Sequence, residues 1–241
     1  LKPYDTSSEL YKQYTAEEYP HIIKTEKLKK LAHTIVGEEK NPVLQASMIY
    51  DWIATNFPWA GAREYSTIPN IPEYVVENRH GDCGQVALLY ITLVRCLGIP
   101  ARWESGFMLH PGAENYHDWA ETYFEGTGWV ATDPSFGRST TGESLADYYK
   151  TGIDLYRFVV NKGVNGSLDP KKNYIRSETV DNQAGEVEWK NGNLEYKDWT
   201  SDLHVDSCIK IDINRPEYSW ALTKLSVASM RTSGDHAAEM A

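Results

Sequence analysis

Three side chains that lie far apart in the sequence have the types needed for nucleophilic catalysis. Cys83 follows the turn His80-Gly81-Asp82, and His117 and Asp133 stand at the start and the end of two later strand-like segments. In such a set a thiolate attacks a carbonyl carbon, and an imidazole holds the proton and returns it to the leaving amine. A carboxylate fixes the imidazole tautomer. These residue types predict acyl chemistry through a thioester intermediate.

The turn before Cys83 should lead directly into a helix. Apolar residues at positions 86, 89, 90, 93 and 97 follow the helical period, and Gly98 and Pro100 mark the C-terminal end. The pattern predicts an amphipathic helix with Cys83 at its N-terminus. Unpaired N–H groups and the macrodipole then predict a thiol pKa below the usual value of about 8.5. An inert buried cysteine is the alternative, and this segment alone supports both equally.

Two strands should bring His117 and Asp133 together. Residues 116–124 alternate between two faces, with His117 and Trp119 on the same one, and a glycine-containing turn leads to the strand 129–132. In a hairpin the start of the first strand lies beside the end of the second. The two side chains are therefore expected within hydrogen-bonding distance of each other.

The segments around these residues resemble the transglutaminase-like superfamily. The motifs are Gly81-Asp82-Cys83-Gly84-Gln85, Tyr116-His117-Asp118-Trp119-Ala120-Glu121 and Gly128-Trp129-Val130-Ala131-Thr132-Asp133-Pro134-Ser135, with Tyr50-Asp51-Trp52-Ile53 upstream. The resemblance covers roughly residues 25 to 137. It implies a papain-like α+β core in which Cys83 is the nucleophile, His117 the general base and acid, and Asp133 the residue that orients the imidazole.

The resemblance also implies an oxyanion hole with two donors. One is the backbone N–H of Cys83 at the helix start. Family members often supply the second from an aromatic side chain upstream of the cysteine, and Trp59 is the candidate because its indole only donates. The alternative is that Trp59 merely packs within its loop. Trp119 and Glu121 should brace the strand of His117. No role is assigned to Gln85, Asn115 or Asp118.

The fold class expected is α+β, with N-terminal helices, the cysteine at the start of a central helix and an antiparallel sheet. Helices are predicted over 6–19, around Leu28 to Ile35, from Pro42 and from Pro72 to Asn78, with a loop over 57–71. Strands are predicted over 101–108, 116–124, 129–132, 156–160, 186–189, 193–199 and 203–213. Residues 1–160 should form the catalytic core, and 161–241 a β-rich extension with a loosely ordered tail from Arg215.

Composition limits the partners. The chain has 24 Lys and Arg against 34 Asp and Glu, a net charge of −10, and lacks a long basic run, which argues against nucleic-acid binding. No apolar run approaches the roughly 18 residues of a transmembrane segment.

Cys96 and Cys208 have no CxxC spacing and are expected to be small core residues. The first residue, Leu1, is compatible with a mature fragment whose removed leader directed it to the periplasm or outside the cell, and the compartment is left open.

The function predicted is a cysteine-dependent amide hydrolase, a peptidase acting on a peptide or protein substrate without a cofactor. Hydrolysis is favoured over transfer to an amine because the chain lacks the extra domains of the large crosslinking enzymes and an acidic calcium loop. Two further interpretations stay open. One is a catalytically silent module that binds peptide or glycan through aromatic side chains. The second is a metal site of His80, Cys83 and His117, which lacks a fourth ligand nearby. Substrate identity and oligomeric state are not predicted.

Overall fold

The computed structural model describes residues 2–61, 63–137, 143–177, 180, 183–201, 203, 205 and 230–232. The helices are α1 (Glu9–Thr15), α2 (Glu26–Val36), α3 (Pro42–Asn56), η1 (Tyr65–Thr67), α4 (Ile71–Asn78), α5 (Cys83–Cys96), η2 (Pro134–Phe136), α7 (Glu143–Lys150) and η3 (Tyr196–Asp198). The strands are β1 (Ala101–Met108), β2 (Asn115–Phe124), β3 (Gly128–Thr132), β4 (Arg157–Lys162), β5 (Val187–Trp189), β6 (Gly192–Leu194), β7 (Trp199–Ser201) and β8 (Met230–Thr232). In this part of the chain no helix is long and apolar enough to cross a bilayer.

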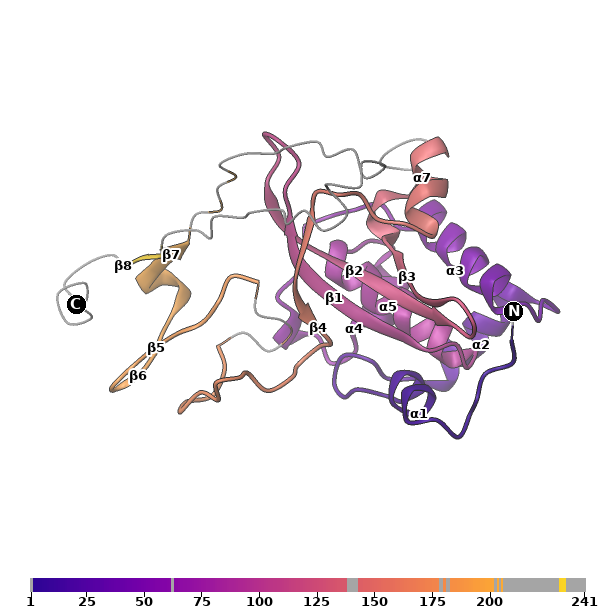
Figure 1. Cartoon of the computed structure of the whole chain (residues 1–241), viewed down its shortest axis with the longest axis horizontal. Coiled ribbons are helices and arrows are strands. Elements are labelled where there is room, and N and C mark those ends of the chain that lie inside the picture. The colour runs from indigo at the N-terminus through magenta and orange to yellow at the C-terminus, as the bar shows by residue number, and fades with distance from the viewer. Residues whose placement is uncertain are drawn as a thin grey trace, which may run out of the picture.

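A four-stranded antiparallel sheet with the order β3-β2-β1-β4 forms one layer of the fold. Helix α5 packs against β1 and β2, and its other sides contact α2, α3 and α4 (Figure 1). The largest group of buried apolar side chains fills the space between these elements. The predicted α+β class is confirmed, and the helix that begins at Cys83 lies at its centre.

Helix α5 is more deeply buried than the amphipathic pattern predicts. Every residue from Gly84 to Arg95 is buried, so the prediction of an amphipathic helix was wrong. A helix enclosed on all sides is the expected state when neighbouring layers cover each face. Its buried cation is compensated, because Arg95 donates to the carbonyl of Ala101 at 2.9 Å and pairs with Glu18 at 2.7 Å. Of the helix, only the end residues Cys83 and Cys96 are partly exposed.

The helix starts follow from their caps. Asn41 accepts a hydrogen bond from the backbone N–H of Val43 at 2.9 Å, with proline at the first helical position of α3, as predicted. The predicted helix over 6–19 is corrected at both ends: Ser8 is the N-cap of α1, and the helix ends at Thr15. The next residue, Ala16, is extended, and its carbonyl accepts a hydrogen bond from Arg95 at 2.7 Å.

Strand β4 lies at the edge of the sheet beside β1, close to the predicted position. Gly106 permits this pairing, since a Cβ at that position would lie 1.9 Å from the carbonyl oxygen of Phe158. The hairpin predicted at Asn191-Gly192 is confirmed as β5 and β6, but the strand predicted over 193–199 was wrong, because β6 ends at Leu194 and is followed by η3 and β7. Most of the strand predicted over 203–213 lies outside the described residues, as do Cys208 and most of the predicted loose tail. The domain boundary at residue 160 stays a prediction.

Candidate active site

The N-terminus of α5 is held in place by a side-chain cap. Asp82 accepts a hydrogen bond from the backbone N–H of Gln85 at 2.9 Å and another from the hydroxyl of Tyr65. The Gln85 side chain donates in turn to the carbonyl of Arg63 at 3.1 Å, which ties the loop before α4 to the helix. Cys83, the first helical residue, lies on the wall of a cavity of about 720 Å³.

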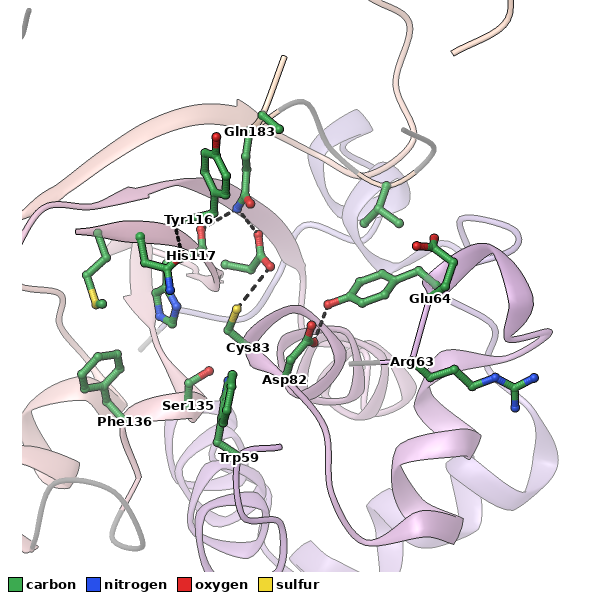
Figure 2. A pocket seen from close by; sticks show the side chains of 16 residues that line it. Trp59, Arg63, Glu64, Asp82, Cys83, Tyr116, His117, Ser135, Phe136 and Gln183 are labelled. Carbon is green, nitrogen blue, oxygen red and sulfur yellow. Dashed lines mark hydrogen bonds between the residues drawn. The ribbon is translucent and has the colours of Figure 1, made fainter. Parts of the chain in front are cut away.

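The hairpin of β2 and β3 brings His117 and Asp133 together as predicted. His117 Nε2 lies 2.7 Å from Asp133 Oδ2, and the carboxylate is 0% exposed. His117 lines the same cavity as Cys83, and Figure 2 shows the sulfur and the imidazole facing a common space. Because Nε2 is engaged by the carboxylate, Nδ1 is the ring nitrogen left to exchange a proton within the cavity.

Asp118 is a contact of Cys83 that the sequence did not indicate. The thiol donates to Asp118 Oδ2 at 3.4 Å, and the amide of Gln183 donates to the other oxygen of that carboxylate (Figure 2). The amide also donates to the carbonyl of His117 at 2.8 Å. Gly84 makes the approach possible, since a Cβ there would lie 2.7 Å from Asp118 Oδ2. Gln183 reaches the site from a distant segment, and no local sequence pattern marks it.

The electrostatic environment of Cys83 corrects the predicted acidic thiol. Burial raises the pKa of Cys83 well above its ordinary value, and the carboxylates of Asp118 and Asp82 raise it further. The prediction from the helix N-terminus was wrong because it considered one element alone, whereas desolvation and two negative charges come from tertiary packing. The raised pKa favours the protonated thiol, which needs a proton acceptor before its sulfur can act as a nucleophile.

The fold favours the charged form of the Asp133 carboxylate. Burial opposes its ionisation, but His117 and the guanidinium of Arg157 outweigh that effect, so the pKa of Asp133 lies below its ordinary value. The backbone N–H of Ser135 adds a hydrogen bond to Oδ1 at 3.0 Å. A buried carboxylate that stays ionised can accept a hydrogen bond from an imidazole and so fix its orientation.

Trp59 lies at the mouth of the same cavity. Its side chain is 60% exposed, so it is not packed within its loop. The loop itself is fixed against the cysteine turn, because the N–H of Ala60 donates to the carbonyl of Gly81 at 3.0 Å. The indole is thus held beside the start of α5 (Figure 2).

Neighbouring side chains support the strand of His117 as expected. The Trp119 indole donates to Glu104 Oε2 at 2.8 Å, and Arg102 Nε donates to Glu121 Oε2 at 2.6 Å. Asn115 lines the cavity and accepts a hydrogen bond from the N–H of Tyr116. Within the described ranges no three His, Cys, Asp or Glu side chains are grouped as metal ligands, so the interpretation of His80 as a ligand with Cys83 and His117 has no cluster to support it.

Replacement of Asp118 by asparagine should make Cys83 more reactive. The substitution removes a negative charge that raises the pKa of the thiol, so the thiolate fraction at pH 7 should rise. The measurement is the rate of iodoacetamide labelling of the Cys83 peptide by mass spectrometry. Asp147→Asn, at an exposed position of α7, is the matched control and should not change the rate. An unchanged or slower rate in Asp118→Asn would contradict this electrostatic assignment.

Known proteins match this chain over part of its length. The uncharacterized protein YebA of Bacillus subtilis (strain 168) is 25% identical over 149 residues, which cover 54% of this chain and 20% of that protein. A structure from Cytophaga hutchinsonii described as a "putative cysteine protease" is 27% identical with a TM-score of 0.46, over 53% of this chain and 43% of that one. The periplasmic domain of TgpA from Pseudomonas aeruginosa is 18% identical with a TM-score of 0.45, over 55% and 49%. The chain therefore spans about a fifth of its curated relative and less than half of each of these structures.

A family model covers the helix and the strands that carry Cys83, His117 and Asp133, while other residues that line the cavity, among them Phe136 and Gln183, lie outside the match. It matches residues 29–134, from α2 through the hairpin to the residue after Asp133. The matched segment carries Cys83, His117 and Asp133 on the helix and strands described above. Residues 29–134 match the model of the transglutaminase-like superfamily, and they supply most of the buried apolar core.

Proposed function

We propose that this protein is a cysteine-dependent hydrolase of peptide amides, with Cys83 as the nucleophile, His117 as the general base and acid, and Asp133 as the orienting carboxylate. The observation that carries the proposal is the 2.7 Å contact of His117 Nε2 with a fully buried Asp133, on the wall of the cavity that holds the Cys83 thiol. Neither a structural histidine nor a binding module needs this arrangement beside a thiol.

The raised pKa of Cys83 determines the order of the first steps. The raised pKa favours the protonated thiol, so the thiol turns from Asp118 to His117, whose Nδ1 removes the proton as the sulfur attacks the carbonyl carbon. The resulting oxyanion collapses, the C–N bond breaks, and the imidazolium gives the proton to the leaving amine. A water molecule then gives a proton to His117 and attacks the thioester, which releases the acid and restores the thiol. Asp133 stays ionised throughout and holds Nε2.

Hydrolysis and acyl transfer share the thioester and differ in the group that attacks it. A peptide library should be incubated with the protein in the presence and absence of a primary amine, and the products should be identified by mass spectrometry. We expect new carboxyl ends in both reactions and unchanged yields when the amine is added. Amine adducts as the main product would establish transfer instead. The absence of both products, together with peptide binding, would establish the silent module.

Replacement of Trp59 by phenylalanine should test the second oxyanion donor. The substitution keeps an aromatic ring at the cavity mouth and removes the indole N–H. Loss of one oxyanion donor is expected to lower kcat about 10²- to 10³-fold with little change in KM. Trp129→Phe is the control, since Trp129 packs on Arg102 in the sheet, and it should keep the wild-type kcat. A wild-type kcat in Trp59→Phe would remove Trp59 from the site.

A further inference from the structure

The residue behind the His117–Asp133 pair is a buried arginine that comes from outside the matched family segment. Arg157 is the first residue of β4, and its side chain is 2% exposed. Its Nη1 lies 3.0 Å from Asp133 Oδ2, the same oxygen that faces His117. The contact is an ion pair without the alignment of a hydrogen bond.

We propose that Arg157 is a positioning residue of this site, which keeps Asp133 ionised while His117 is neutral; this inference rests on the proposed function. A fully buried carboxylate is costly unless a charge compensates it. His117 supplies a positive charge only when it is protonated, which is the wrong moment for a base about to accept a proton. A guanidinium remains charged at every pH at which proteins are folded. Arg157 therefore supplies the compensation that the neutral imidazole does not.

The surroundings of Arg157 immobilise its guanidinium. Its Nε donates to Asp154 Oδ2 at 3.0 Å, and Asp154 also accepts from the Tyr149 hydroxyl at 2.9 Å. The guanidinium lies 4.8 Å from the ring centroid of Phe136 and 5.6 Å from that of Trp119. These contacts hold a cation in a nearly dry environment, where its charge acts strongly on Asp133.

By keeping Asp133 ionised, Arg157 also determines which tautomer His117 adopts. An ionised Asp133 only accepts, so it selects the tautomer with hydrogen on Nε2 and leaves the lone pair on Nδ1 for the thiol proton. Without Arg157, the buried Asp133 would take up a proton and donate to Nε2. The ring hydrogen would then sit on Nδ1, and His117 could no longer act as a base toward Cys83.

Other charged and titratable groups face this pair and must be kept constant in the test. They are Tyr50 on α3, Asp82 and Cys83 at the start of α5, Asp118 on β2, Tyr149 on α7, and Asp154 with its partner His110. None of these groups is a permanent cation, so none of them can replace Arg157 as the positive charge that compensates Asp133.

The experiment compares Arg157→Met, which removes the charge, with Arg157→Lys, which keeps it. We expect kcat to fall on the order of 10²-fold in Arg157→Met with KM nearly unchanged, and the acid limb of its pH profile to move up by about one pH unit. Arg157→Lys should recover most of kcat and the wild-type limb. Arg102→Met, at a second arginine that stacks on an aromatic ring, is the control for lost packing and should leave the limb in place. A wild-type limb in Arg157→Met would overturn the proposal.

A double mutant keeps the test decisive if Arg157→Met folds poorly. Asp133→Asn removes the charge that Arg157 compensates, so Arg157→Met added to it should lower kcat no further. A further large loss would show that Arg157 acts in another way.

¹⁵N NMR of the His117 ring reads the tautomer without substrate, and we expect Nε2–H in the wild type and loss of that tautomer in Arg157→Met. This readout separates the two proposals: an unchanged tautomer overturns the role of Arg157, whereas failure to cleave any amide overturns the proposed function alone.

Discussion

Replacement of Cys83 by alanine is expected to abolish amide cleavage and leave the fold intact. In the proposed reaction the thiol supplies the atom that forms the thioester, and alanine has no group that could replace it. The structural loss is one long S–H···O contact of 3.4 Å from a weak donor to the Asp118 carboxylate, which contributes about 1 kcal/mol. Turnover on a verified peptide and the thermal unfolding midpoint provide the two measurements.

Cys96→Ala is the matched control for that experiment. Cys96 ends the same helix, is partly exposed and packs at the edge of the apolar core, far along the helix from the cavity. We expect this variant to keep its activity. Intact-mass spectrometry after mixing with substrate should detect an acyl adduct on wild type and Cys96→Ala but not on Cys83→Ala. Turnover by Cys83→Ala at the wild-type rate would rule out Cys83 as the nucleophile.

Replacement of Asp133 by asparagine should lower kcat by about 10⁴-fold. The neutral amide can donate to His117 Nε2 and so favours the wrong tautomer, and it leaves the buried Arg157 without its counter-charge. Asp51→Asn, at a partly exposed position that pairs with Lys150, is the control and should retain activity. A loss in Asp133→Asn no larger than in this control would contradict the assignment.

The stability of the same variant should depend on pH in a defined direction. Folding lowers the pKa of Asp133, so its ionised form stabilises the wild type above its unfolded pKa of about 3.9. That contribution is lost as the pH falls through the lower, folded value. Denaturant unfolding should therefore show a large difference between wild type and Asp133→Asn at neutral pH and a smaller one in acid. A constant difference would place the effect in packing instead of charge.

The parts of the fold that short-range patterns determine could be predicted from the sequence. The Asn41-Pro42 pair begins α3, and the helical period after Cys83 defines α5. The glycine-containing turn between β2 and β3 sets the hairpin register, which in turn brings His117 to Asp133. In each case the deciding residues lie within a few positions of the element that they control.

The parts of the site that depend on distant segments could not be predicted. Arg157 and Gln183 reach the centre from β4 and from the segment beyond it, and neither carries a motif. The pKa of Cys83 was predicted with the wrong sign for the same reason. A helix dipole can be inferred from the sequence, but the burial of the thiol and the approach of Asp118 exist only after folding.

The enclosure of α5 on all sides limits how this protein could acquire a new binding preference. Substitutions along the helix would have to be accommodated by dense packing, and they would displace Cys83 before they altered recognition. Other residues that line the cavity are less constrained, and we call them the rim: Trp59 and Arg63 belong to a loop, and Met108 and Tyr116 lie at strand ends. Laboratory evolution for altered selectivity should therefore accumulate its changes at this rim and leave the central helix untouched.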